Sequence, residues 1–322
     1  MRTTFYVSRA IDKSPNEKNW SRLMAATVRK LRKSDRNDIM EISHHIWEGH
    51  DYLSSVVDQW LQDQNSNFYG VEVDGHVVAV GNLRLVEGGR TGWMEGLRVH
   101  PEYRGRGLAN DITRHIVGRA EHLGVGRLRY TTSDENVASL KLAKMAGFSK
   151  ILRMAVSWHD KLKQIPAPAD YPPVTKRIPE TACDLLKTNV HIIPRGILIY
   201  DWKALDSTRK SLEEIGKTHT FYIALKRRKV DSLSIGCRGQ TPNEPYWSFT
   251  IYATDSNGFL SQLSHSVAMA LKHGVNVIMC TFEARFEKTL NELDLGSEEH
   301  QQTHLVLLEK QMHQRKQSHA PL

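Results

Sequence analysis

A short glycine-rich segment between a strand-like run and a helix-like run constrains this chain most. The pattern predicts a strand over residues 92–99, and Pro101 interrupts sheet pairing after it. An amphipathic helix is predicted to follow the segment Arg104-Gly105-Arg106-Gly107-Leu108-Ala109. Backbone N–H groups at a helix start lack intrahelical acceptors and lie at the positive end of the helix dipole. Gly105 and Gly107 would let the backbone approach a bound group closely. The segment therefore predicts an anion site at a strand-to-helix turn.

The surrounding pattern predicts an α+β unit over residues 26–163. Turn signals such as Asp74-Gly75 and Gly88-Gly89 separate strand-like runs, which indicates an antiparallel meander before the glycine-rich turn. The expected strands cover residues 28–31, 67–73, 77–86, 92–99, 127–132 and 151–159, and the expected helices cover a run from about 35, then 53–61, 108–123 and 137–146.

The second half repeats this order of elements. Five prolines within residues 164–179 indicate a linker over 164–180, because proline interrupts helices and central strands. Residues 181–312 then suggest a degenerate second copy of the first domain, with an unrelated α+β cap as the alternative. At the equivalent turn this half has Asp255-Ser256-Asn257-Gly258, where a carboxylate would repel a phosphate. Residues 1–25 are interpreted as an extension and 313–322 as a tail.

Composition excludes several other classes of protein. The net charge is +8, but ten of the 44 Lys and Arg residues fall within positions 1–36, and no basic helix or basic-aromatic repeat indicates a nucleic-acid groove. Three widely spaced cysteines favour neither a disulfide framework nor a zinc site. No run is long and apolar enough for a membrane helix. We expect a cytoplasmic protein, although the basic start leaves a weak organelle-targeting signal open.

A second motif makes the glycine-rich turn specific. The chain resembles the GNAT acetyltransferases over residues 27–160, because both signature motifs of that family occur in order with one strand between them. The first motif is carried by Arg104, Gly107 and Ala109, and the second by Asn136, Ser139, Gly147 and Phe148.

The resemblance implies a GNAT fold, with a mixed and mostly antiparallel central sheet, and acetyl-CoA as co-substrate without a metal. In that fold two central strands separate and the thioester lies in the opening, where the Val99 amide would polarise its carbonyl. Backbone groups of Leu97, Arg98 and Val99 would hold the pantetheine arm together with Asn136. The pyrophosphate would be held by the segment Arg104, Gly105, Arg106, Gly107, Leu108 and Ala109.

The chemistry requires a base, because an amine is mainly protonated near neutral pH. Strand alternation predicts Trp93, Glu95 and Leu97 on one face, so Glu95 is the candidate base, acting directly or through water. The alternative is an ordinary strand carboxylate paired with an arginine. The family's thiolate-protonating tyrosine corresponds to Ala143 here, so Tyr130, Tyr52 or water would replace it, and Tyr130 is our candidate.

The acceptor is predicted from the region that walls the acceptor pocket in GNAT enzymes. Residues Gly49, Asp51, Tyr52, Leu53, Trp60 and Leu61 are similar to the histidine N-acetyltransferase group. This implies a small amine acceptor such as the α-amino group of L-histidine, with His50, Asp51, Tyr52 and Trp93 in the pocket and Arg84 or Arg98 for a carboxylate. The histidines at positions 44, 45 and 50 are not expected to bind metal, since adjacent residues do not share a helix face.

Other functions remain open. A polyamine, an aminoglycoside or a protein N-terminus would suit the same chemistry, and the substitution at Ala143 also fits a non-catalytic acetyl-CoA-binding module. The sequence gives no oligomeric state.

Overall fold

The computed structural model describes residues 26–46, 51–241, 244–296 and 301–312. Within these residues the chain divides into two compact units that interleave along the sequence. Unit 1 contains the described residues up to Tyr130, together with Ala138–Ser149 and the chain from Glu309, and unit 2 contains Thr131–Val137 and Lys150–Leu308. The proline-rich segment had predicted a single boundary at 164–180 instead. In the described part of the chain, no helix has the length and apolar character needed to cross a bilayer.

Unit 1 is built on the predicted meander. Its strands lie in the order β1-β2-β3-β4-β5, antiparallel except for the parallel pair β4–β5. The mixed, mostly antiparallel sheet is therefore confirmed. The elements are β1 Thr27–Lys30, α1 Arg36–His44, α2 Leu53–Gln62, β2 Ser66–Val73, β3 His76–Val86, β4 Thr91–Val99, α3 Leu108–His122, β5 Arg127–Ser133 and α4 Val137–Met145.

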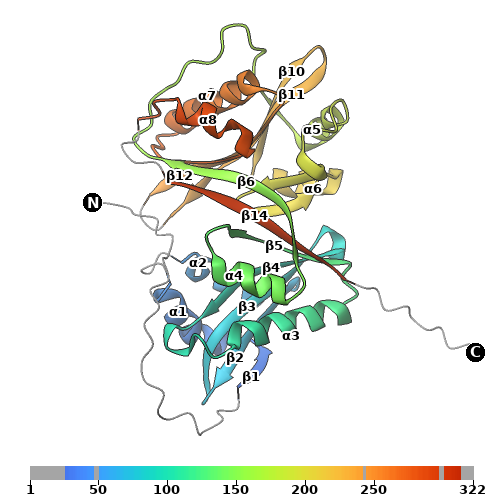
Figure 1. Cartoon of the computed structure of the whole chain (residues 1–322), viewed down its shortest axis with the longest axis vertical. Helices are drawn as coiled ribbons and strands as arrows, with labels where there is room; N and C mark the ends of the chain where they lie inside the picture. Colours follow the sequence, from blue (N-terminus) through green and yellow to red (C-terminus); the bar gives the residue numbers. More distant parts are fainter. Residues whose placement is uncertain (1–25, 47–50, 242–243, 297–300, 313–322) are drawn as a thin grey trace, which may run out of the picture. The chain divides into compact units, whose positions relative to one another are not determined.

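Helix α3 packs along β2, β3 and β4 (Figure 1). Its buried positions Leu108, Ile112, Ile116 and Ala120 recur every four residues, so they form one apolar stripe. The helix comes close to β3 because Gly81 has no side chain: a Cβ there would lie 2.7 Å from Ile112 Cγ2. The opposite face of the sheet is covered by α1 and α2, whose core residues include Ile39, Leu53 and Trp60. Each fully buried aliphatic side chain, such as Ile39 or Leu53, contributes about 2 kcal/mol to the free energy of unfolding.

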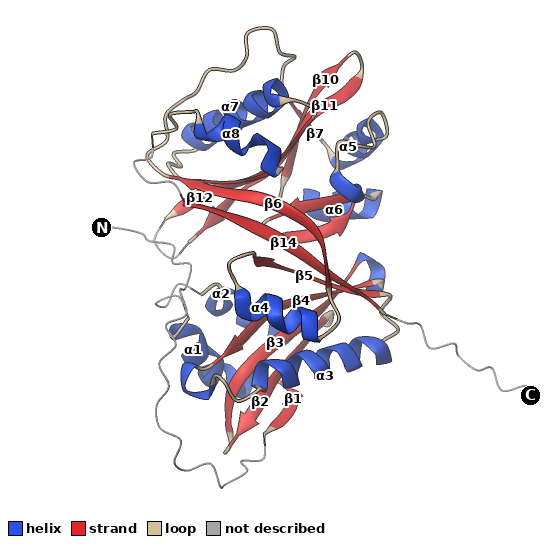
Figure 2. Cartoon of the chain, in the orientation of Figure 1, coloured by secondary structure: helices blue, strands red, loops and turns tan. Residues whose placement is uncertain are grey.

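The strands described with unit 2 continue in the order β14-β6-β13-β12-β11-β10-β7 (Figure 2), and β8 and β9 form a separate two-stranded sheet. Strands β12 and β13 pair in parallel. The elements are β6 Ser149–His159, β7 Thr175–Arg177, α5 Pro179–Leu186, β8 Ile197–Tyr200, β9 Lys203–Asp206, α6 Arg209–Gly216, β10 Thr220–Lys226, β11 Lys229–Gln240, β12 Pro245–Ala253, α7 Ser256–Lys272, β13 Ile278–Phe282, α8 Glu287–Asn291 and β14 Gln301–Gln311.

Three of these elements were not predicted. Strand β7 lies at the edge of the sheet, where flanking prolines are tolerated, and α5 begins at Pro179, whose missing N–H would have no intrahelical partner in the first turn. Strand β9 follows a two-residue turn at Asp201 and Trp202, both with positive φ, which the sequence does not signal with a glycine. That unit 2 descends from a copy of unit 1 stays a prediction.

Candidate functional site

A bulge interrupts β4 at Gly96. Glu95 lies opposite Asn82 of β3, and Arg98 lies opposite Val80. Three steps along β4 therefore correspond to two along β3, so β4 has one extra residue here. Gly96 has a φ of +66°, and a Cβ there would lie 2.5 Å from the Trp60 ring. Only glycine fits both the left-handed conformation and the close approach of the tryptophan. The sequence signal was a glycine inside a strand, which the sequence analysis did not use.

The bulge changes which side chains share a face of β4. Glu95 bonds to Asn82, whereas Leu97 lies on the opposite face near Gly81 and α3, 3.6 Å from where a Gly81 Cβ would stand. The prediction that Glu95 and Leu97 share a face is therefore wrong, because strict alternation fails across a bulge. The register instead gives Arg98 the same face as Glu95.

Strands β4 and β5 pair only at their beginnings. Their parallel register covers Thr91–Trp93 against Arg127–Arg129 and extends no further along the described residues of β4. The His100 amide donates to Val78 O on β3 at 2.9 Å. Since amide directions alternate along a strand, the Val99 amide points to the other edge, from which β5 has separated.

Glu95 belongs to a polar chain inside unit 1. Asn82 Nδ2 donates to Glu95 Oε1 at 3.2 Å, and Ser66 Oγ donates to Asn82 Oδ1 at 2.8 Å. Asn82 is fully buried, so it fixes one carboxylate oxygen while Glu95 itself is half-buried. Trp93, two residues earlier on the same face, is 5% exposed. Neither Asn82 nor Ser66 was predicted, because polar residues inside apolar strands give no indication of their partners.

Arg98 is held by a buried carboxylate. Its Nε and Nη2 donate to the two oxygens of Asp51 at 3.0 and 2.9 Å, and Nη1 donates to Leu97 O at 3.0 Å. The Asp51 side chain is fully buried. A guanidinium engaged in this way is a poor partner for a substrate carboxylate, and Asp51 positions Arg98. His50, another predicted pocket residue, lies outside the described residues.

Tyr52 lies over Arg98, with the guanidinium carbon 5.3 Å from the ring centroid. Burial raises the pKa of its hydroxyl; the Arg98 charge lowers that pKa, and the Glu95 and Asp51 charges raise it. The hydroxyl therefore keeps its proton at neutral pH beside Glu95 and Gly96. The residue as a whole is 43% exposed, so Tyr52 is accessible to a ligand.

The predicted anion turn is open at the start of α3. Gly105 and Gly107 have φ of +76° and +83°, and an added Cβ would meet no atom within 4 Å at either position. Among the described residues, the amides of Gly105, Gly107, Leu108 and Ala109 have no acceptor. These N–H groups and the helix dipole form a site for a negatively charged group.

Two arginines flank this turn, and each donates to a main-chain oxygen. Arg104 Nε donates to Val99 O at 3.4 Å, and Arg106 Nη2 donates to Glu102 O at 2.9 Å, with its guanidinium over the Tyr103 ring. Both side chains are exposed.

The corresponding helix start in unit 2 is closed. Asp255 is the N-cap of α7, and its Oδ1 accepts from the Gly258 amide at 2.8 Å. A carboxylate thus occupies the position that is open at α3, and a Cβ on Gly258 would meet Tyr171 Oη at 2.8 Å. The difference agrees with the prediction that the second turn does not bind a phosphate.

Tyr130 lies on β5 directly after the last residue paired with β4. Its hydroxyl donates to Ser139 O on α4 at 3.3 Å, and its ring contacts Phe148 at 5.3 Å between centroids. Burial raises the pKa of Tyr130, and the Ser139 hydrogen bond lowers it. Ala143, on the same helix, is buried and offers no hydroxyl. Asn136 lies in the turn before α4, where its backbone N–H donates to Ser133 O at 3.1 Å.

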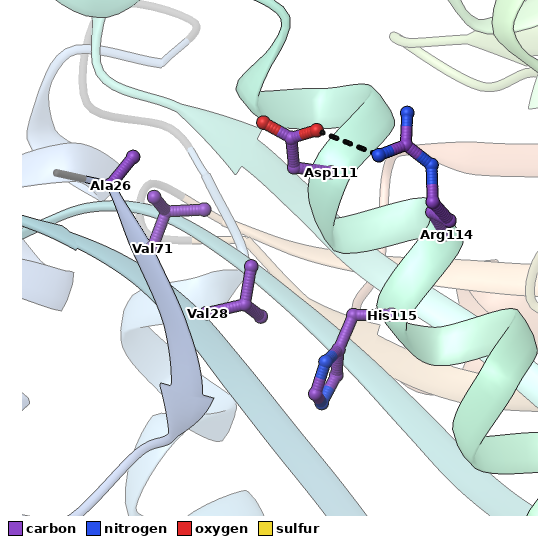
Figure 3. Close-up of a pocket in the computed structure, with 6 residues that line it drawn as sticks. All are labelled: Ala26, Val28, Val71, Asp111, Arg114 and His115. Atoms are coloured by element: carbon purple, nitrogen blue, oxygen red, sulfur yellow. Dashed lines mark hydrogen bonds and ion pairs between the residues drawn. The ribbon is translucent and has the colours of Figure 1, made fainter. Parts of the chain in front are cut away.

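An open pocket of unit 1 lies apart from the predicted site residues. Figure 3 shows Asp111, Arg114 and His115 of α3 beside Val28 of β1, with Ala26 and Val71 completing the wall. None of the predicted site residues lines it, and Asp111 and Arg114 are 3.5 Å apart, which leaves their charges compensated. The β4 edge and the α3 turn remain the better candidates for chemistry.

Comparisons with known proteins point to one family. Residues 29–148 match the acetyltransferase (GNAT) family. A histidine N-acetyltransferase from Xenopus tropicalis is 29% identical over 213 residues, which cover 60% of this chain and 62% of that protein. The histidine N-acetyltransferase of Oreochromis niloticus is 37% identical over 82 residues, 26% of this chain and 24% of that protein. A GCN5-related N-acetyltransferase from Sphaerobacter thermophilus shares the fold, with a TM-score of 0.61 at 13% identity over 89% of this chain and 95% of that chain.

Proposed function

Residues 29–148 of this chain form a GNAT acetyltransferase domain, and on that premise we propose that the protein transfers the acetyl group of acetyl-CoA to the α-amino group of a free amino acid such as L-histidine. The observation that carries the proposal is the open start of α3, where four amides have no acceptor within the part of the chain that the structure describes. This helix start follows β4, from which β5 has separated. Acetyl-CoA supplies an activated acetyl thioester.

The cofactor roles follow from these groups. The amides of residues 105–109 bind the pyrophosphate, and Arg104 and Arg106 add positive charge at its edge. The edge of β4 at Leu97, Arg98 and Val99 binds the pantetheine arm in place of a neighbouring strand. The Val99 amide, directed to that edge, donates to the thioester carbonyl oxygen as negative charge develops there. Asn136 is assigned to the pantetheine region from its motif alone.

Glu95 removes the proton from the incoming ammonium group. Asn82 Nδ2 donates to Glu95 Oε1 at 3.2 Å, which orients the carboxylate, and a carboxylate held in this way accepts a proton directly or through one water. The amine nitrogen then attacks the thioester carbon, the carbon–sulfur bond breaks as the amide bond forms, and the nitrogen releases its second proton to solvent. Tyr130, whose raised pKa keeps its hydroxyl protonated at neutral pH, delivers a proton to the departing thiolate.

The acceptor assignment rests on relatives and on the charges around Glu95. The histidine N-acetyltransferase of Xenopus tropicalis supports a free amino acid, at moderate identity. An amino-acid carboxylate needs a cation, and Arg98 already donates two hydrogen bonds to Asp51. This favours Arg84, whose side chain is on the same face of the sheet as that of Glu95. The Arg84 side chain is one-third exposed, and its Nε lies 3.6 Å from Asp63 Oδ2. Tyr52 and Trp93 would line the pocket.

Coenzyme A release with L-histidine, histamine and spermidine tests this assignment. We expect L-histidine to have the highest kcat/KM, and Arg84→Gln to raise the KM for L-histidine about tenfold with little effect on histamine, which lacks the carboxylate. A preference for spermidine would contradict the amino-acid assignment. Binding of acetyl-CoA without turnover of any amine in a broad panel would contradict the enzymatic proposal and favour a binding module.

A further inference from the structure

Three side chains with metal-ligating atoms meet within unit 2, outside the site described above. Asp201 comes from the turn between β8 and β9, His219 from the residue before β10, and Cys237 from β11. One ligand atom from each lies within 4.8 Å of the others. The positions are widely spaced in sequence and form no short motif, so the sequence analysis expected no metal here.

The histidine is oriented by its other nitrogen. His219 Nδ1 lies 2.8 Å from Thr218 Oγ1, and the Thr218 hydroxyl also reaches Ile215 O at 3.4 Å. When the hydroxyl donates to that carbonyl, its oxygen accepts from Nδ1–H, and Nε2 carries a lone pair. Metal-ligating histidines are usually fixed through the second nitrogen in this way.

That lone pair faces the cluster in a buried position. The His219 side chain is 5% exposed, and Nε2 has no hydrogen-bond partner among the described residues although Asp201 Oδ2 is 3.4 Å away. Cys237 Sγ lies 3.6 Å from the same Asp201 oxygen. A buried polar nitrogen without a partner is costly, and a cation between these atoms would satisfy it.

The two spacings that involve the Asp201 oxygen agree with a tetrahedral ion. Zinc–nitrogen and zinc–oxygen bonds of about 2.0–2.1 Å and a zinc–sulfur bond of about 2.3 Å place nitrogen and oxygen ligands about 3.4 Å apart, and oxygen and sulfur about 3.6 Å apart. The two distances in the structure have these values.

We propose that Asp201, His219 Nε2 and Cys237 Sγ bind a divalent transition metal of the zinc class, with water as the fourth ligand. Binding replaces the thiol proton, which is released to solvent. The Asp201 side chain is 28% exposed, which gives the ion a path to the cluster. The metal would join the β8–β9 hairpin, which forms a separate sheet, to the strands β10 and β11.

A nucleophilic cysteine does not fit the same geometry. In a cysteine–histidine–carboxylate arrangement the imidazole lies between thiol and carboxylate and uses a different nitrogen for each. Here the carboxylate oxygen is near both Sγ and Nε2, while Nδ1 is taken by Thr218. A buried ion pair between Asp201 and a protonated His219 is the remaining alternative, and it requires no metal.

The test uses the full chain, stripped of metal with a chelator and then titrated with Zn²⁺ or Co²⁺. We expect about one zinc per chain, and a thiolate-to-cobalt charge-transfer band with Co²⁺. Cys237→Ser should remove the band and weaken zinc binding at least tenfold, and His219→Asn should weaken it similarly. Cys183→Ser, a half-buried cysteine on α5, is the matched control and should behave as wild type.

A second measurement needs no substitution. Alkylation of the wild-type protein, followed by peptide mass spectrometry, should show that zinc slows modification of Cys237 at least tenfold while leaving Cys183 unchanged. Absence of stoichiometric zinc on folded wild-type protein, or equal alkylation of Cys237 with and without zinc, would overturn the metal site and leave the ion pair between Asp201 and His219.

Discussion

The role of Glu95 in proton transfer can be tested by replacing its carboxylate with an amide. Glu95→Gln preserves the shape of the side chain and a partner for Asn82 but removes the base, so we expect kcat to fall about 10²-fold while the Kd for acetyl-CoA stays unchanged. Steady-state kinetics and calorimetry measure the two quantities. Glu102→Gln, an exposed carboxylate just beyond β4, is the control and should retain wild-type turnover. Unchanged kcat in Glu95→Gln would exclude Glu95 as the base.

Tyr130 can be tested by removing its hydroxyl alone. Burial raises its pKa above the ordinary value of 10.0, so the folded protein keeps the phenol protonated at neutral pH and loses the proton only in more alkaline solution. We expect Tyr130→Phe to lower kcat about tenfold without changing the KM for acetyl-CoA. Tyr52→Phe provides the comparison, because Tyr52 also keeps its proton and is the competing donor. A larger loss of kcat in Tyr52→Phe would transfer the role to Tyr52.

Single residues were predictable where a motif fixes their backbone role. The turn at Gly105 and Gly107 has the positive φ and open surroundings that the motif implied. The partners of side chains were not predictable: Asp51 was assigned to the substrate pocket, yet it is buried against Arg98. Sequence spacing carries no information on which of two distant residues meet.

At the scale of elements, the β4 bulge should be indispensable to the site. Gly96→Ala would place a Cβ 2.5 Å from Trp60 at a φ of +66°, so we expect the free energy of unfolding to fall by about 1–3 kcal/mol and kcat/KM to fall more than tenfold. Gly118→Ala on α3 is the control: its Cβ would meet nothing, and alanine there should stabilise the helix by up to about 1 kcal/mol. Urea unfolding measures the stability of both variants, and steady-state kinetics measure their kcat/KM. A fully active Gly96→Ala variant would contradict the prediction that the bulge is required for the site.

Local patterns located most elements but not their irregularities. The strands β2, β3 and β4 and helix α3 follow from alternation, turn signals and helical spacing. The bulge was missed because it depends on Trp60, a residue from a different element that packs against the strand. Helix α5 was missed because prolines were interpreted only as breakers, although proline is compatible with the first turn of a helix.

At the scale of the whole molecule, the end of the chain completes unit 1. Arg129 Nε of β5 donates to Glu309 Oε2 of β14 at 2.7 Å, and the arginine side chain is 3% exposed. Glu309→Gln would remove a negative charge that is hydrogen-bonded to this buried guanidinium, so we expect unit 1 to lose about 3 kcal/mol of its free energy of unfolding.

Urea unfolding followed by a spectroscopic probe measures this loss. Asp294→Asn removes an exposed ion pair with Lys163 and should cost less than about 1 kcal/mol. Equal effects in the two variants would show that the Arg129–Glu309 pair does not hold unit 1 together.

The interleaving of the units was beyond sequence reasoning. Turn residues and prolines mark where elements begin and end, and they led to one boundary at 164–180. The assignment of Lys150 to unit 2 and of Glu309 to unit 1 depends on strand pairing between residues far apart in the chain, which a local pattern does not encode.

The central claim is that main-chain amides at the start of α3 bind the pyrophosphate of acetyl-CoA, and calorimetry of acetyl-CoA binding tests it most directly. Gly107→Glu adds a carboxylate at the open helix start, whereas Gly124→Glu adds the same group just beyond the other end, also at a positive φ with open space. We predict that wild type and Gly124→Glu bind acetyl-CoA with equal Kd, while Gly107→Glu binds at least a hundredfold more weakly. Folded wild-type protein that binds no acetyl-CoA, or a Gly107→Glu variant with unchanged Kd, would contradict the account.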